Sequence, residues 1–130
     1  MIIDSSAIIA IALQEPEAER MASAIAKSSE RHISAVNWFE TMMVLEGRAG
    51  EPASDGALLI LSQLEVKTLP FGEAQMHEAQ EAWRRYGKGR HPASLNLGDC
   101  CAYATAKTTG RSLLFKGGDF GKTDIPAAPW

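Results

Sequence analysis

The chain has 130 residues, of which 45% are hydrophobic and 22% are charged, and its formal net charge is −3 at pH 7. A chain of this length and composition is typical of one globular domain with its own core, expected here to span residues 1–130. No apolar run is long enough for a membrane-spanning helix, and the apolar start lacks basic residues and contains Asp4, so we expect neither a membrane span nor a signal peptide.

The first part of the chain is predicted to begin with a short apolar strand that ends in Asp4. A second strand is expected in HISAV, which contains β-branched residues. Pro16 is expected at the early-helix position where proline is tolerated. The expected elements are strands over residues 1–4 and 32–36 and helices over residues 6–13, 17–28 and 37–50.

The second part continues the alternation, with Gly110 as the expected end of the last helix. The expected elements are helices over residues 53–64, 72–87 and 96–110 and strands over residues 66–69 and 112–115. Strands that alternate with helices favour a parallel sheet covered by helices on both faces, which is an α/β fold with three layers (α/β/α).

Four acidic residues are predicted to gather at one edge of this sheet. Asp4 ends the first strand and Asp119 follows the last one. Glu40 and Asp99 lie in the first turns of helices that are expected to begin at the same edge. Because ligands of open parallel sheets bind outside the carboxyl ends of the strands, we expect these four carboxylates to form one cluster.

Two of the acids also have a purely structural interpretation. The spacings Asn37-x-x-Glu40 and Asn96-x-x-Asp99 both match a capping box, in which side chains satisfy the free N–H groups of a helix start. A carboxylate at a buried strand end, such as Asp4, is harder to explain, because its burial is costly unless it is paired or bound to a metal ion.

Four convergent carboxylates predict a site for a divalent cation, since they would otherwise repel one another and raise each other's pKa. Oxygen ligands without paired His or Cys favour Mg²⁺ or Mn²⁺, and such a site suits phosphodiester hydrolysis. Ser6 could orient Asp4 through a hydrogen bond, or it could cap the first helix.

The turn GGDFGKT, residues 117–123, looks like a nucleotide-binding loop but fails the pattern. Only three residues separate Gly117 from Gly121, one fewer than a phosphate-binding loop requires. The prolines in the following residues also exclude the helix that would hold the phosphates. The residue of interest in this turn is therefore Asp119.

The cysteines and histidines do not predict a zinc site or a disulfide. Cys100 and Cys101 are adjacent, and His32, His77 and His91 share no ligand spacing. We expect buried, reduced cysteines and a cytoplasmic location.

Basic residues are concentrated near the end of the chain. Residues 1–82 contain 5 Lys or Arg and 13 Asp or Glu, whereas residues 83–130 contain 8 and 3. The densest stretch, WRRYGKGRHP, favours either a phosphate-binding surface or a solvated helix end.

Four stretches in order, MIIDSSAIIAIAL, HISAVNWFE, LNLGDCCAYATAK and LLFKGGDFGKTDI, resemble the PIN-domain ribonuclease toxins of the VapC family, and the resemblance covers nearly the whole chain. It implies a single PIN domain with Mg²⁺- or Mn²⁺-dependent endoribonuclease activity. Asp4, Asp99 and Asp119 would bind the metal, and Glu40 would orient or deprotonate the attacking water. Many relatives carry an acid where this chain has Gly118, which leaves a one-ion and a two-ion mechanism open.

The resemblance also implies partners. These are an RNA substrate, a VapB-type antitoxin that inhibits the nuclease, operator DNA reached through the antitoxin complex, and a second copy of the chain in a homodimer. The candidates for contact with the RNA backbone are Arg84, Arg85, Lys88, Arg90, Lys116 and Lys122.

Two alternative functions stay open. A phospho-acceptor receiver domain has a similar fold, an acidic pocket and a lysine after a late strand, here Lys116. Receivers need an adjacent acid pair after the first strand, and this chain has Ser5 and Ser6 there. The other alternative is a catalytically inactive PIN module that only binds a partner.

Overall fold

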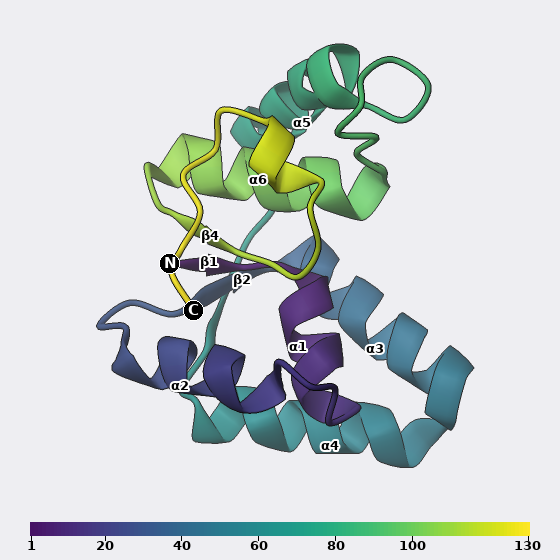
Figure 1. Ribbon diagram of the computed structural model, residues 1–130, viewed down its shortest axis with the longest axis vertical. Helices are drawn as coiled ribbons and strands as arrows, with labels where there is room; N and C mark the ends of the chain where they lie inside the picture. The colour runs from purple at the N-terminus through teal and green to yellow at the C-terminus, as the bar shows by residue number, and fades with distance from the viewer.

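The centre of the protein is a four-stranded, fully parallel sheet with the strand order β3-β2-β1-β4 (Figure 1). The computed structural model describes all residues from 1 to 130. The strands are short: β1 (Ile2–Ile3), β2 (His32–Ser34), β3 (Lys67–Leu69) and β4 (Leu113–Leu114). This arrangement confirms the predicted α/β fold.

Successive residues of the neighbouring strands β1 and β4 face opposite sides of the sheet, as the pleat requires. Ile2 and Leu113 belong to a core shared with α5 and α6, and Ile3 and Leu114 belong to a second core shared with α1 to α4. Figure 1 shows these two helical layers above and below the sheet. The helices are α1 (Ser5–Ala12), α2 (Ala18–Lys27), α3 (Ala35–Ala49), α4 (Glu51–Gln63), α5 (Glu73–Tyr86) and α6 (Leu97–Thr109), with a 3₁₀ turn η1 (Phe120–Lys122).

Helix α6 lies between the sheet and α5, and this explains its composition. Every residue from Cys100 to Ala106 is buried, so a single apolar stripe would not suffice. Small side chains at Ala102, Ala104 and Ala106 allow the neighbouring elements to pack closely. Cys100 and Cys101 are buried and unpaired within this helix, as predicted.

Two predictions about helix starts are wrong. Pro16 lies in the turn before α2 and not in its first turn, although α2 begins at Ala18, one residue from the predicted start. Helix α3 begins at Ala35 with Ser34 as its N-cap, because the Ser34 hydroxyl accepts the hydrogen bond from Asn37 N. Asn37 is therefore inside the helix, and the predicted capping box of Asn37 and Glu40 does not form.

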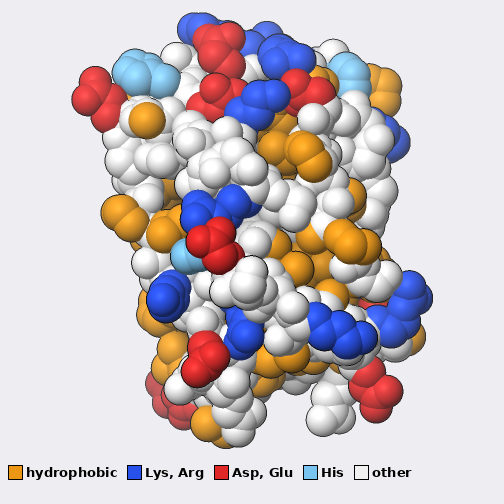
Figure 2. All heavy atoms as spheres, turned by 90° about the vertical axis from the view of Figure 1, so that its left-hand side faces the viewer, with side chains coloured by type: hydrophobic (Ala, Val, Ile, Leu, Met, Phe, Trp, Pro, Cys, Tyr) orange, Lys and Arg blue, Asp and Glu red, His pale blue; other side chains and the backbone are white.

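No helix in the structure combines the length and the apolar character that a membrane span needs. The face at the amino ends of the strands carries acidic and basic side chains close together (Figure 2). Two ion pairs there join Arg111 to Glu30 and Arg31 to Glu65. The predicted acids lie at the opposite, carboxyl edge.

Candidate active site

Asp4 follows β1 directly and is also the N-cap of α1. Its Oδ2 accepts hydrogen bonds from the Ser6 backbone N at 3.0 Å and from Ser6 Oγ at 2.5 Å. Ser6 Oγ in turn accepts a hydrogen bond from Lys116 N at 3.0 Å, which ties the end of β4 to this corner. Ser6 therefore orients Asp4, while Asp4 itself caps the helix.

The Asp4 side chain is almost completely buried, with 2% of its surface exposed. This burial raises the pKa of Asp4 to about 7, and the nearby charges of Asp99 and Glu40 act in the same direction, while the hydrogen bonds from Ser6 oppose it. A cation that replaces the lost hydration would stabilise the charged form of this buried carboxyl group.

Glu40 lies in the second turn of α3 and reaches across to the start of α6. Its Oε2 accepts hydrogen bonds from Ser5 Oγ at 2.5 Å and from Asn37 Nδ2 at 3.3 Å. The carboxylate packs directly on Gly98, where a Cβ atom would overlap it. Glycine at position 98 is thus a condition for the close approach of Glu40.

Asp99 is the third acid of the cluster, in the first turn of α6. Its Oδ2 accepts a hydrogen bond from Asn96 N at 2.8 Å, and its own N–H donates to Asn96 Oδ1 at 2.9 Å. The predicted capping box of Asn96 and Asp99 is therefore correct. Burial raises the pKa of Asp99, and the charges of Glu40 and Asp119 add to the rise.

Asp119 stands at the N-cap position of η1, after β4, and its side chain is exposed. No hydrogen bond holds its carboxylate, and its charge acts on Asp99. Gly117 has the positive φ of 104° that turns the chain here, and a side chain at Gly118 would meet open space. Each predicted acid is thus within range of the charge of another, but the four do not form one close group.

Asn37 was not predicted as a site residue, yet it is fully buried at the centre of the cluster. Its Nδ2 lies 3.1 Å from Gly98 O, 3.3 Å from Glu40 Oε2 and 3.4 Å from Asp4 Oδ1. Ser5 was also missed. Neither residue has a spacing in the sequence that marks it, because both act on partners that are distant along the chain.

The chemistry of this donor set fits a hard divalent cation. None of the ion pairs in the protein includes Asp4, Glu40, Asp99 or Asp119, so no basic side chain neutralises these acids. Carboxylate oxygens are the ligands that Mg²⁺ and Mn²⁺ prefer. As they stand, however, no three His, Cys, Asp or Glu side chains are close enough together to hold an ion.

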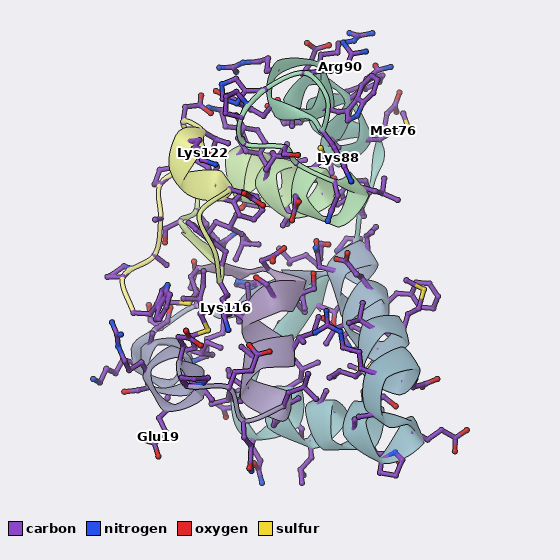
Figure 3. The ribbon with its side chains drawn as sticks, turned by 45° about the vertical axis from the view of Figure 1, so that its right-hand side comes forward. Glu19, Met76, Lys88, Arg90, Lys116 and Lys122 are labelled. Carbon is purple, nitrogen blue, oxygen red and sulfur yellow. The ribbon has the colours of Figure 1, made fainter.

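Most of the predicted RNA-binding residues already have partners within the chain. Lys116 pairs with Glu15 at 2.6 Å and Glu17 at 3.0 Å, so its side chain is directed away from Asp4. Figure 3 shows Lys116 near α1 and apart from Lys88 and Arg90, which belong to the loop after α5. The lysine that a receiver domain would place at its acidic pocket is therefore engaged elsewhere.

The basic stretch after α5 is partly self-paired as well. Arg84 pairs with Glu81, and Arg85 lies 3.7 Å from Asp124. Arg90 stacks its guanidinium 3.9 Å from the centre of the Trp83 ring. Lys122 Nζ donates to Pro92 O at 3.0 Å. Lys88 has no ion pair.

Comparison with known proteins identifies the family. A sequence profile described as PIN domain matches residues 1–126. A protein named Ribonuclease VapC from Mycolicibacterium smegmatis is 45% identical over 127 residues, which is 98% of either chain. The chain belongs to the PIN-domain family, in its VapC branch.

Solved structures of VapC proteins share the fold. The crystal structure of Mycobacterium tuberculosis VapC20, a toxin described as cleaving the sarcin–ricin loop, superposes with a TM-score of 0.78 over 95% of both chains at 19% identity. VapBC2 from Rickettsia felis, bound to a DNA fragment from its promoter, gives a TM-score of 0.75 over 97% of this chain and 94% of that chain at 12% identity. The PIN fold is thus retained where few residues are shared.

Proposed function

We propose that this VapC-family protein is the toxin of a type II toxin–antitoxin system and a Mg²⁺- or Mn²⁺-dependent endoribonuclease. The observation that carries the proposal is the buried Asp4 carboxyl group, which lies beside Glu40 and Asp99 without a basic partner. Full-length identity of 45% to a VapC ribonuclease supports the activity.

Asp4, Asp99 and Asp119 would hold the ion, which when bound supplies positive charge for the phosphate and lowers the pKa of a water molecule. Glu40 is the base that orients or deprotonates this water, because its Oε1 accepts no hydrogen bond from the protein while Ser5 and Asn37 fix its Oε2. The water oxygen forms a bond to phosphorus and the P–O3′ bond breaks. The O3′ atom takes up a proton from solvent water, so the products are a 3′-hydroxyl and a 5′-phosphate.

Ser6 contributes through its hydroxyl, which donates to Asp4 Oδ2. This hydrogen bond would keep the Asp4 side chain in one orientation when a cation binds. The same serine connects Asp4 to the backbone of Lys116, three residues before Asp119.

The partners proposed for this protein are RNA, a VapB-type antitoxin that brings it to operator DNA, and a second copy of the chain. Exposed apolar side chains near the acids support a protein interface there. Val36, Phe39, Met43 and Leu97 line a hollow of about 160 Å³ together with Glu40 and Gly98. A protein bound at this hollow would also block access to Glu40.

The test is cleavage of a structured RNA by the purified protein with and without Mg²⁺ or Mn²⁺. We expect cleavage that EDTA abolishes and that Asp4→Asn lowers by at least about 100-fold, since the substitution removes a charged ligand. Asp55→Asn on the exposed face of α4 is the matched control and should cleave like the wild type. Equal cleavage by Asp4→Asn and the wild type would refute the mechanism, and labelling of an aspartate by acetyl phosphate would favour a receiver.

A further inference from the structure

A single neutral side chain connects three of the acid-bearing segments. The Asn37 amide reaches Asp4 at the end of β1, Glu40 one turn further along α3, and the carbonyl of Gly98 in the first turn of α6. Other donors serve one acid each, Ser6 for Asp4 and Ser5 for Glu40. Asn37 is thus the side chain common to both carboxylates.

The orientation of this amide is set by Ser34. Ser34 Oγ donates to Asn37 Oδ1 at 2.6 Å and accepts from Asn37 N at 3.0 Å, and both residues are fully buried. If the amide were turned over, its oxygen would face Asp4, Glu40 and Gly98 O, which are all acceptors. The observed orientation is therefore favoured, because it directs the two N–H groups toward these acceptors and leaves the oxygen to accept from Ser34 Oγ.

We infer that Asn37, oriented by Ser34, is a positioning residue that fixes the separation of the Asp4 and Glu40 carboxylates and so prepares the site for a divalent cation. The inference rests on the proposed metal-dependent function. The amide has no charge, so it holds Asp4 at a fixed distance from Glu40 without bringing a positive charge that would compete with the ion for Asp4. Removal of a residue that orients metal-binding carboxylates typically weakens metal affinity 10- to 100-fold.

The experiment is a calorimetric titration of the full chain with Mn²⁺ alone, at fixed pH and after treatment with a chelator. We expect Asn37→Ala to weaken the Mn²⁺ Kd by about 10-fold or more. Ser34→Ala touches no carboxylate, and it should still weaken the Kd by about 3- to 10-fold because the amide loses its fixed orientation.

Thr41→Val is the matched control. Thr41 lies one turn further along α3, is fully buried, and its hydroxyl donates to Asn37 O without reaching any acid. This variant loses a buried hydrogen bond of the same helix, and its Mn²⁺ affinity should equal that of the wild type. Ser34→Ala keeps the inference testable if Asn37→Ala does not fold.

The outcomes separate this inference from the proposed function. Wild-type affinity in both Asn37→Ala and Ser34→Ala would overturn the positioning role alone, as would an equal loss in Thr41→Val, which would indicate a general structural effect. A wild-type protein that binds Mn²⁺ without cleaving RNA would refute the nuclease while leaving the Asn37 result standing. A wild-type protein that binds no Mn²⁺ would overturn both.

Discussion

Gly98 determines how closely α6 can approach the Glu40 side chain. The residue is buried in the first turn of α6, its carbonyl accepts the Asn37 amide, and a Cβ atom there would overlap the Glu40 carboxylate. By helix propensity alone, alanine would be preferred to glycine at this position. Glycine is therefore required here by the contact and is unfavourable for the helix itself.

We expect Gly98→Ala to lower the rate of RNA cleavage by about 10-fold or more, because Glu40 or the start of α6 must move. The initial rate of cleavage at saturating Mg²⁺ measures the effect. Gly56→Ala in α4 is the control, since a Cβ atom there meets open space, and it should raise the free energy of unfolding by about 0.5–1 kcal/mol with full activity. A Gly98→Ala rate within twofold of the wild type would contradict the role of this contact.

The pKa of Asp4 predicts how the stability of the metal-free protein depends on pH. Since the pKa is raised from 3.8 to about 7, the folded protein holds a proton that the unfolded chain releases between these values. The contribution of Asp4 to the free energy of unfolding should therefore fall as the pH rises, by about 2 kcal/mol between pH 5 and pH 8. Above pH 7 the fall should level off.

Denaturant unfolding of the wild type and Asp4→Asn in EDTA measures this contribution as the difference between the two proteins. The asparagine does not titrate, so the difference should change with pH in the stated direction. A difference that is constant from pH 5 to pH 8, or that grows in favour of the wild type, would show that Asp4 is charged in the metal-free fold.

At the scale of the elements, the alternation of strands and helices was correctly predicted because apolar periodicity and the Gly110 stop are local signals. The start of α3 was not, because Ser34 and Asn37 are both good N-caps, only three residues apart. Tertiary contacts decide between them, since the Asn37 amide is needed at Asp4, Glu40 and Gly98. The same dependence on distant partners kept Asn37 and Ser5 out of the predicted site.

The end of α5 and the loop after it form the part of the basic surface that we expect to contact RNA. Arg84 and Arg85 have acidic neighbours, whereas Lys88 has none and Arg90 lies on the Trp83 ring, which leaves both charges available. A phosphate contact releases counterions, so each one adds to the salt dependence of binding.

On an uncleaving Asp4→Asn background, we expect Lys88→Ala combined with Arg90→Ala to weaken RNA binding and to reduce the slope of log affinity against log salt by about 1 to 2. Arg84→Ala should have a smaller effect, because Glu81 already neutralises that charge. Lys27→Ala at the end of α2 is the control and should leave the slope unchanged. An unchanged slope in the double variant would assign this surface to another partner.

At the scale of the whole molecule, each face of the sheet has its own hydrophobic core, and the helical layers on both faces carry acids of the site. Glu40 belongs to the layer of α1 to α4, Asp99 and the Phe120 turn beside Asp119 belong to the layer of α5 and α6, and Asp4 ends the strand between them. A parallel sheet with helices on both faces could be predicted from the alternation of elements, whereas the strand order β3-β2-β1-β4 could not. The assignment of each helix to a layer could not, because it depends on which side chains pack together.

This division has a consequence for local unfolding. At the carboxyl edge the like charges of the acids oppose the hydrogen bond that joins Asn37 of α3 to Gly98 of α6. At the amino edge the ion pair of Arg111 with Glu30 joins the segment after α6 to the segment after α2. The metal-free protein should therefore open first at the carboxyl edge, while the amino edge stays joined. A cation shared by acids of both layers would hold this edge closed, so ion binding would stabilise this part of the fold against local opening.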